Sequence, residues 1–146
     1  MTVDTIAAER TDHRLLDGRA VQRRMLAEIA ADVAERRARH PMGRLVSISI
    51  GDVPEIAVYI RGQARAAERA GLPFDRQSWP ADIDPEAAKA RIAAMNDDPA
   101  VLGVILQRPV PAHLNVRSLQ SAIHPLKDVE GMNPARELVY LRIPPT

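Results

Sequence analysis

The 146-residue sequence contains no cysteine, and only 3% of its residues are aromatic. The absence of cysteine excludes disulfides, thiolate nucleophiles and cysteine-ligated zinc, and it is consistent with a reducing cytoplasm. No apolar stretch approaches the roughly 20 residues that a membrane-spanning helix needs. The opening residues, MTVDTIAAERTDHR, lack the basic-then-apolar order of a signal peptide. We therefore predict a cytoplasmic protein that does not insert into a membrane.

An excess of charge of one sign is also lacking. The formal net charge is +1, and basic residues alternate with acidic ones, so the sequence gives no indication of nucleic-acid binding. The four histidines, His13, His40, His113 and His124, do not have metal-ligand spacing, and we predict no metal site. Hydrophobic residues make up 46% and charged residues 27%, which are ordinary values for one globular domain.

Helical and strand patterns alternate along the chain. Val21, Met25, Ile29 and Val33 recur at helical spacing and predict an amphipathic helix that ends near residue 37. Further helices are predicted over 55–70, 84–96 and 114–123, and strands over 44–51, 73–79 and 100–106. Strands that alternate with helices indicate parallel β-α-β units. We therefore expect a three-layer α/β/α sandwich with a mainly parallel sheet.

Two polar segments follow the predicted buried strands, GDVPEIAVYIRGQ after residue 50 and QRPVP after residue 106. Ligands of open α/β sheets bind outside the carboxyl ends of the strands, so these segments are the first candidates for a site. Tyr59 and Gln63 are four residues apart and share a helix face, while Pro109 and Pro111 hold the backbone beside Gln107. A tyrosine over an amide-lined cleft suits a flat heteroaromatic ligand. The same residues are also compatible with a half-buried core tyrosine and a glutamine that merely ends a strand.

Four stretches, in order, carry a family resemblance: LLDGRAV, IGDVPEIAVYIRGQARAAERAGL, GVILQRPVP and IHPLKDVEGMNPA. Together they resemble the N-terminal folate-binding domain of the bifunctional methylenetetrahydrofolate dehydrogenase/cyclohydrolase family. The similarity covers about residues 14–136, which leaves a polar tail at 1–13 and an apolar tail at 137–146. The resemblance implies that a reduced folate, in its methylene or methenyl form, is the bound ligand.

The resemblance also implies roles for single residues. Tyr59 matches the family tyrosine that packs against the folate, and Gln107 matches the glutamine that bonds to the catalytic group. The catalytic lysine of the family falls on Gln63, and the family serine falls on Ile56. A glutamine has no proton to exchange near neutral pH, so we expect no efficient hydrolysis of the family kind.

The segment LKDVEG keeps part of its family pattern. Lys127 and Asp128 match as they stand, and the family aspartate that contacts the pterin falls on Glu130, which is one methylene longer. A carboxylate against a ligand ring in a dry cleft can exchange protons, so Glu130 is also a candidate acid or base. The predicted catalytic residues are Gln63, Gln107 and Glu130, and the predicted substrate-binding residues are Asp52, Ile56, Tyr59, Arg108, Pro109, Asp128 and Glu130.

Family enzymes continue with a Rossmann domain that binds a nicotinamide cofactor, and neither that domain nor a G-x-G-x-x-G loop is present in this sequence. We therefore expect no NAD(P)-dependent hydride transfer by this chain alone. The leading hypothesis is an enzyme of folate-dependent one-carbon metabolism. It would bind methylene- or methenyl-tetrahydrofolate and pass the one-carbon unit to water or to another small-molecule acceptor.

The alternative hypothesis is a non-catalytic folate-binding or partner subunit of a larger one-carbon enzyme. The tail ELVYLRIPP, read as a strand, places Val139, Leu141 and Ile143 on one wholly apolar face. An exposed apolar face of this kind commonly marks a protein interface. We therefore expect a homo-oligomer or docking to another protein.

Overall fold

The computed structural model of the protein describes residues 17–135. The predicted polar tail at 1–13 and the predicted apolar tail at 137–146, with Val139, Leu141 and Ile143, lie outside the described residues. In the described part of the chain, three strands and four helices alternate.

The sheet is parallel and has the strand order β2-β1-β3. Its strands are β1 (Arg44–Ile50), β2 (Phe74–Trp79) and β3 (Val101–Leu106). The central strand β1 is covered on both faces, in keeping with its run of branched residues. The two crossovers from β1 to β2 and from β2 to β3 each contain one helix, as parallel pairing requires.

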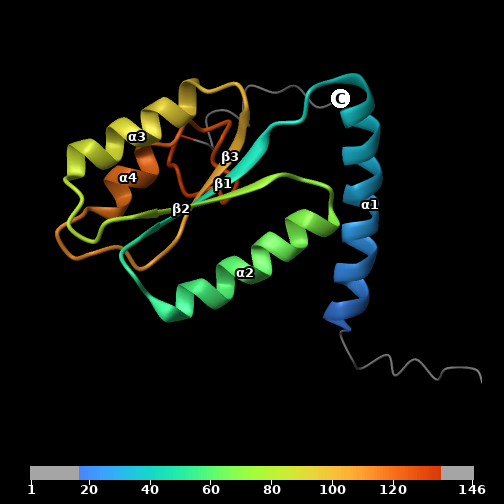
Figure 1. Ribbon diagram of the computed structural model, residues 1–146, viewed down its shortest axis with the longest axis horizontal. Coiled ribbons are helices and arrows are strands. Elements are labelled where there is room, and N and C mark those ends of the chain that lie inside the picture. Colours follow the sequence, from blue (N-terminus) through green and yellow to red (C-terminus); the bar gives the residue numbers. More distant parts are fainter. Residues whose placement is uncertain (1–16, 136–146) are drawn as a thin grey trace, which may run out of the picture.

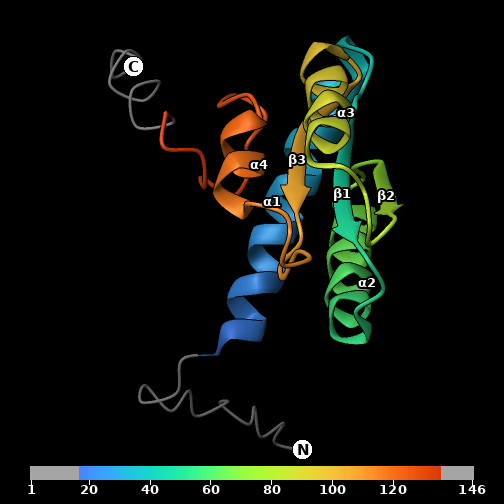
Figure 2. The same ribbon diagram turned by 90° about the vertical axis from the view of Figure 1, so that its left-hand side faces the viewer.

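The helices form the outer layers (Figure 1). They are α1 (Gly18–Arg39), α2 (Pro54–Arg69), α3 (Pro85–Asp97) and α4 (Val116–Ala122). Helices α3 and α4 lie on one face of the sheet and α2 lies on the other, and the rotated view agrees (Figure 2). The predicted α/β/α sandwich with a parallel sheet is therefore confirmed.

The main core lies between the sheet and the α3 and α4 layer. Every second residue of β1 points into this core, and it meets Ala88 and Ile92 of α3 and Leu119 of α4. The start of α3 has a side-chain N-cap: the Asp84 carboxylate accepts hydrogen bonds from the N–H groups of Glu86 and Ala87 at 2.9 and 3.0 Å. The α2 side is covered by fewer buried residues, namely Ile56, Ile60 and Ala67.

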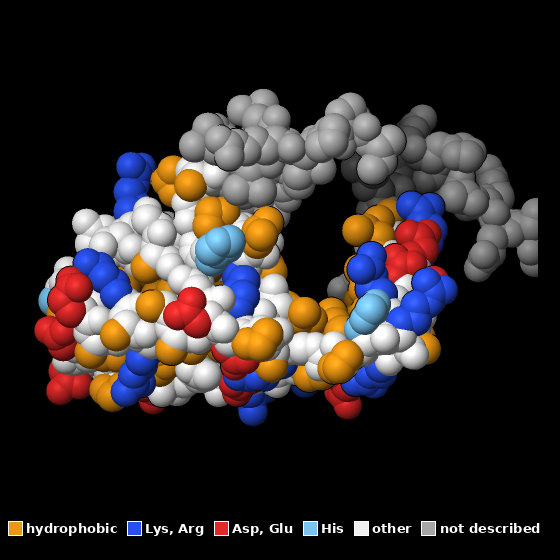
Figure 3. Space-filling view, turned by 90° about the horizontal axis from the view of Figure 1, so that it is seen from above, with side chains coloured by type: hydrophobic (Ala, Val, Ile, Leu, Met, Phe, Trp, Pro, Cys, Tyr) orange, Lys and Arg blue, Asp and Glu red, His pale blue; other side chains and the backbone are white. Residues whose placement is uncertain are grey.

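Helix α1 differs from its prediction. It is helical over Gly18–Arg39, but Val21, Met25 and Ile29 are exposed, and only Val33 of the predicted apolar face is buried. The physical reason is its position: α1 stands apart from the layers and projects past the end of α2 (Figure 1). An open space separates this part of the chain from the rest of the domain, with hydrophobic side chains along its edge (Figure 3).

None of the helices within residues 17–135 is long and apolar enough to cross a membrane.

Candidate functional site

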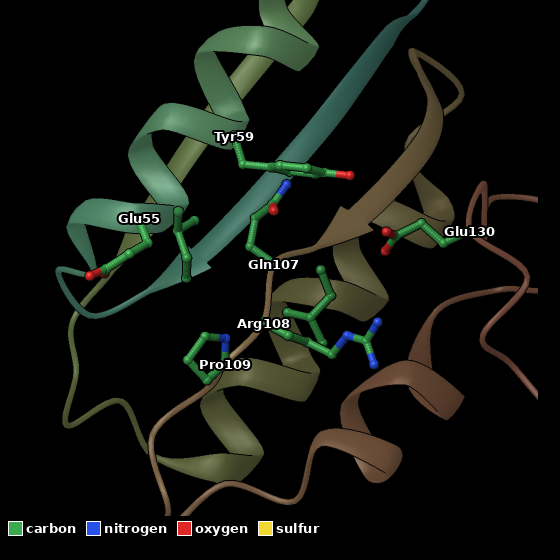
Figure 4. A pocket seen from close by; sticks show the side chains of 8 residues that line it. Glu55, Tyr59, Gln107, Arg108, Pro109 and Glu130 are labelled. Carbon is green, nitrogen blue, oxygen red and sulfur yellow. The ribbon is translucent and has the colours of Figure 1, made fainter. Parts of the chain in front are cut away.

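A pocket of about 330 Å³ lies where the sequence predicts a site, at the carboxyl end of the sheet beside the first turns of α2 (Figure 4). Three segments contribute to it: the start of α2, the end of β3 with its following residues, and the loop after α4. The residues that line it are Glu55, Ile56, Tyr59, Leu106, Gln107, Arg108, Pro109 and Glu130. Five of the predicted site residues are therefore brought together with Gln107 around one cavity.

Gln107 forms the centre of the hydrogen-bond network at this pocket. Its backbone N–H donates to the carbonyl oxygen of Ile48 at 2.9 Å, which extends the β1–β3 ladder by one residue and fixes the start of its side chain. The side-chain Nε2 donates to Gln63 Oε1 at 2.7 Å and to Ser47 Oγ at 2.9 Å. Gln63 and Gln107, which are predicted to face the same centre, are thus in direct contact. The peptide bond that follows, Arg108–Pro109, is cis.

Ser47 is a site residue that the sequence analysis missed. It is 0% exposed, and it lies on β1 between Val46 and Ile48, which point into the main core. Strand alternation therefore directs Ser47 toward the α2 side, where its hydroxyl meets Gln107. The available signal was a serine inside a strand predicted to be buried on both faces, because a buried hydroxyl needs a hydrogen-bond partner.

Tyr59 is 67% exposed, so it is not a core tyrosine. Figure 4 shows its ring above the side chain of Gln107, at the edge of the pocket. Ile56, one turn earlier, is buried and contributes an apolar wall, and Glu55 contributes a carboxylate that the sequence analysis did not select. The ring face, the amide and the apolar wall form one side of a cleft that suits a flat ligand.

Glu130 and Arg108 face the pocket from the opposite side (Figure 4). Partial burial raises the pKa of the Glu130 carboxyl, and the negative charge of Asp128 raises it further, while Arg108 and the backbone N–H of Leu106 act in the opposite direction. The net shift is upward, so Glu130 holds its proton at higher pH than an ordinary glutamate. A carboxyl group with a raised pKa in a pocket can act as a proton donor or acceptor.

Asp128 supports the pocket from behind. It is 5% exposed and does not line the cavity. Its Oδ1 accepts from the N–H groups of Glu130 and Gly131 at 3.2 and 3.1 Å, and its Oδ2 accepts from Asn133 N–H at 2.7 Å. These bonds shape the loop that carries Glu130. A direct contact between Asp128 and the ligand stays a prediction.

Two further residues from the sequence analysis lie away from the pocket. Lys127 donates from Nζ to the carbonyl oxygens of Met95 and Asp98 at 2.8 and 2.6 Å, so it caps the end of α3. Asp52 is exposed in the turn after β1 and does not line the cavity. No group of three or more histidine, aspartate or glutamate side chains within residues 17–135 is arranged to hold a metal ion.

Comparison with known proteins agrees with this geometry. Residues 16–130 match the family model of the tetrahydrofolate dehydrogenase/cyclohydrolase catalytic domain. The chain belongs to this family. It is 67% identical over 128 residues to the bifunctional protein FolD of Rhodobacter capsulatus, a match that covers 88% of this chain and 43% of that protein. A FolD 3 protein of Roseobacter denitrificans is 66% identical over 124 residues, with 85% and 42% covered.

Solved structures of the family show the same fold. The bifunctional FolD enzyme of Campylobacter jejuni superposes with a TM-score of 0.81 at 26% identity and covers 86% of this chain and 44% of its own. A 5,10-methylenetetrahydrofolate dehydrogenase of the silkworm Bombyx mori gives 0.78 at 29% identity, with 82% and 41% covered. The chain therefore spans less than half the length of these relatives. The predicted family membership and fold are confirmed.

Proposed function

We propose that this chain binds a reduced folate in the Tyr59–Gln107–Glu130 pocket and acts on its one-carbon unit. The observation that carries the proposal is the 2.7 Å hydrogen bond between Gln107 Nε2 and Gln63 Oε1. This bond joins Gln63, which occupies the position of the family's catalytic lysine, to Gln107, the residue expected to orient the group at that position. The pair lies at the edge of a cleft with an aromatic wall. Relatives of the chain are named as methylenetetrahydrofolate dehydrogenases and cyclohydrolases, which supports a methylene- or methenyl-tetrahydrofolate as the ligand.

The chemistry we assign is hydrolysis of the methenyl bridge, which leaves the carbon on the folate as a formyl group, or transfer of the one-carbon unit to another small-molecule acceptor. Water addition to a methenyl carbon releases a proton, and opening of the ring requires a proton at the folate nitrogen. Gln63 can do neither, because an amide does not exchange protons near neutral pH. We assign both steps to Glu130, which would accept the first proton as a carboxylate and return it as a carboxylic acid; its pKa is shifted upward, the direction that favours the acid form.

The proposal includes no nicotinamide-dependent step for these residues. The loop after β1, residues 51–53, has a single glycine, and residues 107–115 after β3 have none. Neither loop has the glycine-rich turn that lets a backbone approach a pyrophosphate. The proposal therefore assigns a reduced folate, and no nicotinamide cofactor, to the described residues.

A second candidate function is a folate-binding or partner subunit without catalysis of its own. Gln63 favours it, because the residue at the catalytic position has no exchangeable proton. The exposed apolar residues of α1 also favour it, since Val21, Met25 and Ile29 offer a surface to another protein or to a second copy. We place either activity in the cytoplasm, in agreement with the absence of cysteine.

Calorimetry with methylene- and methenyl-tetrahydrofolate tests the proposal. We expect both or one of them to bind, and Tyr59→Ala to weaken binding about tenfold because stacking on an aromatic ring contributes about 1–3 kcal/mol. Absence of binding to both folates by the wild-type protein would overturn the proposal. Loss of methenyl absorbance on incubation with the protein, beyond the rate in buffer, separates the enzyme from the binding subunit.

A further inference from the structure

The side-chain amide of Gln107 uses its donors within the protein but not its acceptor. A primary amide carries two N–H donors and one oxygen acceptor. Both donors of Gln107 are in use, one on Ser47 Oγ and one on Gln63 Oε1. The side chain therefore has no donor left for a ligand.

The acceptor of Gln107 is the open atom. Within residues 17–135, no hydrogen bond reaches Gln107 Oε1. In the same residues, every side-chain nitrogen or oxygen that is fully enclosed has a hydrogen-bond partner. Oε1 must therefore touch the space outside the protein, although Gln107 as a residue is only 6% exposed. The space that Gln107 lines is the pocket, so the amide presents an acceptor to whatever the pocket holds.

Most of the other polar groups of the pocket also attract positive charge. Glu55 and Glu130 contribute carboxylates and Tyr59 contributes the negative face of a ring, while Arg108 is the only cation among the lining residues. Acceptors, carboxylates and an aromatic face together attract a flat group with positive charge. A neutral group whose carbonyl oxygen lies against Gln107 Oε1 would place acceptor against acceptor at that position.

We infer that Ser47, Gln107 and Gln63 make this pocket selective for the cationic methenyl form of the one-carbon folate over neutral forms, with Gln63 as the specificity-determining residue. This inference rests on the proposed function. Gln63 Oε1 holds Gln107 Nε2 and so keeps Gln107 Oε1 toward the ligand. Gln63 does not line the pocket itself and acts through Gln107. A lysine at position 63 would add a positive charge behind Gln107 and, as a donor only, would turn the Gln107 oxygen toward itself.

The test compares methenyl-tetrahydrofolate with tetrahydrofolate carrying a neutral formyl group, two ligands that differ at the one-carbon unit. Dissociation constants are measured by rapid ultrafiltration for the wild type, Gln63→Glu, Gln63→Lys and Ser47→Ala. Ala93→Lys is the charge control, because Ala93 is exposed on α3, on the other side of the sheet from α2. The readout is the ratio of the two constants, which a general loss of stability does not change.

We expect the wild type to favour the methenyl form by on the order of tenfold, as one charge interaction at partial burial supplies. Gln63→Glu keeps an acceptor for Gln107 and adds a negative charge, so it should widen the ratio. Gln63→Lys should abolish or reverse the ratio, Ser47→Ala should reduce it, and Ala93→Lys should leave it unchanged. Equal binding of both folates by the wild type, or a ratio that Gln63→Lys does not move, overturns the inference and leaves the proposed function standing. Binding of neither folate overturns the proposed function itself.

Discussion

Two polar side chains at the carboxyl end of the sheet are buried to nearly the same degree but use their hydrogen bonds differently. Asp128 directs its two carboxylate oxygens at three N–H groups of its own loop, and these bonds serve the fold. Gln107 donates hydrogen bonds to Ser47 and Gln63, and its oxygen accepts no hydrogen bond from the described residues and is open to the pocket that Gln107 lines. The two residues therefore differ not in burial but in the atom left without a protein partner, and this difference is the basis of the role we propose for Gln107.

The first prediction changes the partner of Gln107. Gln63→Lys places a proton-exchanging group where the family resemblance implies one, and Gln107 lies within hydrogen-bond reach of this position and can turn its oxygen to accept from the lysine. A positioned acid or base contributes on the order of 10²- to 10⁴-fold in rate, so we expect methenyl-tetrahydrofolate hydrolysis at saturating ligand to rise by up to that factor. Loss of methenyl absorbance measures it.

The double variant Gln63→Lys with Gln107→Ala is the control for this gain. Without Gln107 the new lysine is not oriented, and the gain should disappear. If Gln63→Lys binds folate but shows no gain, the pocket supports a chemistry different from that of the family, and Ile56 and Glu130 become the residues to exchange next.

The second prediction concerns Asp128 and the stability of the fold. Asp128→Ala leaves three loop N–H groups without their acceptor, and we expect it to lower the free energy of unfolding by about 3 kcal/mol. Urea denaturation measures the change. Asp82→Ala is the matched control, because Asp82 is exposed, and its effect should stay within about 0.5 kcal/mol. Equal effects of the two variants would contradict the scaffold role of Asp128.

The third prediction tests the open atom of Gln107. Gln107→Met keeps the length of the side chain and removes the amide, so we expect methenyl-folate binding to weaken about tenfold at a stability cost of only about 1 kcal/mol. Gln120→Met is the control: Gln120 is also a buried glutamine, but it lies on α4, outside the pocket. It should leave folate affinity unchanged. A larger loss of affinity in Gln120→Met than in Gln107→Met would refute the assignment.

The helices show how far the sequence predicts the fold. The helix at α1 was predicted from its periodic apolar residues and the helix at α3 from its Asp84-Pro85-Glu86 start, and both segments are helical. In α3 the periodic residues Ala88 and Ile92 are buried, whereas in α1 Met25 and Ile29 are exposed. Periodicity determines which face of a helix is apolar. It does not determine which other part of the protein packs against that face, or whether any part does.

The site divides in a similar way. Helix spacing and the rule that ligands bind at strand ends predicted that Gln63 and Gln107 lie near one site, and the family resemblance implied that the two positions pair. The bond from Gln107 to Ser47 joins residues 60 positions apart, and it depends on the register of β1 against β3. Likewise, the bonds of Asp128 arise from the path of a loop. The sequence indicates that a buried Ser47 hydroxyl needs a hydrogen-bond partner, but it does not identify that partner, because the partner depends on how the chain packs.

The fourth prediction has the smallest expected effect and concerns Glu130, which belongs to the Asp128 loop and faces the Gln107 pocket. Its pKa is raised by burial, so the folded protein keeps this proton at pH values where the unfolded chain has released it. Stability contributed by the protonated form is therefore lost as pH rises from the ordinary glutamate range through the folded pKa. Glu130→Gln cannot ionise, so we expect it to be slightly more stable than the wild type at neutral pH and equally stable in acid.

The difference in stability should be small, because the residue is partly in water and its charge is screened. Urea midpoints for both proteins across a pH series measure it, and a difference that stays constant with pH would show that Glu130 acts through packing and not through its charge.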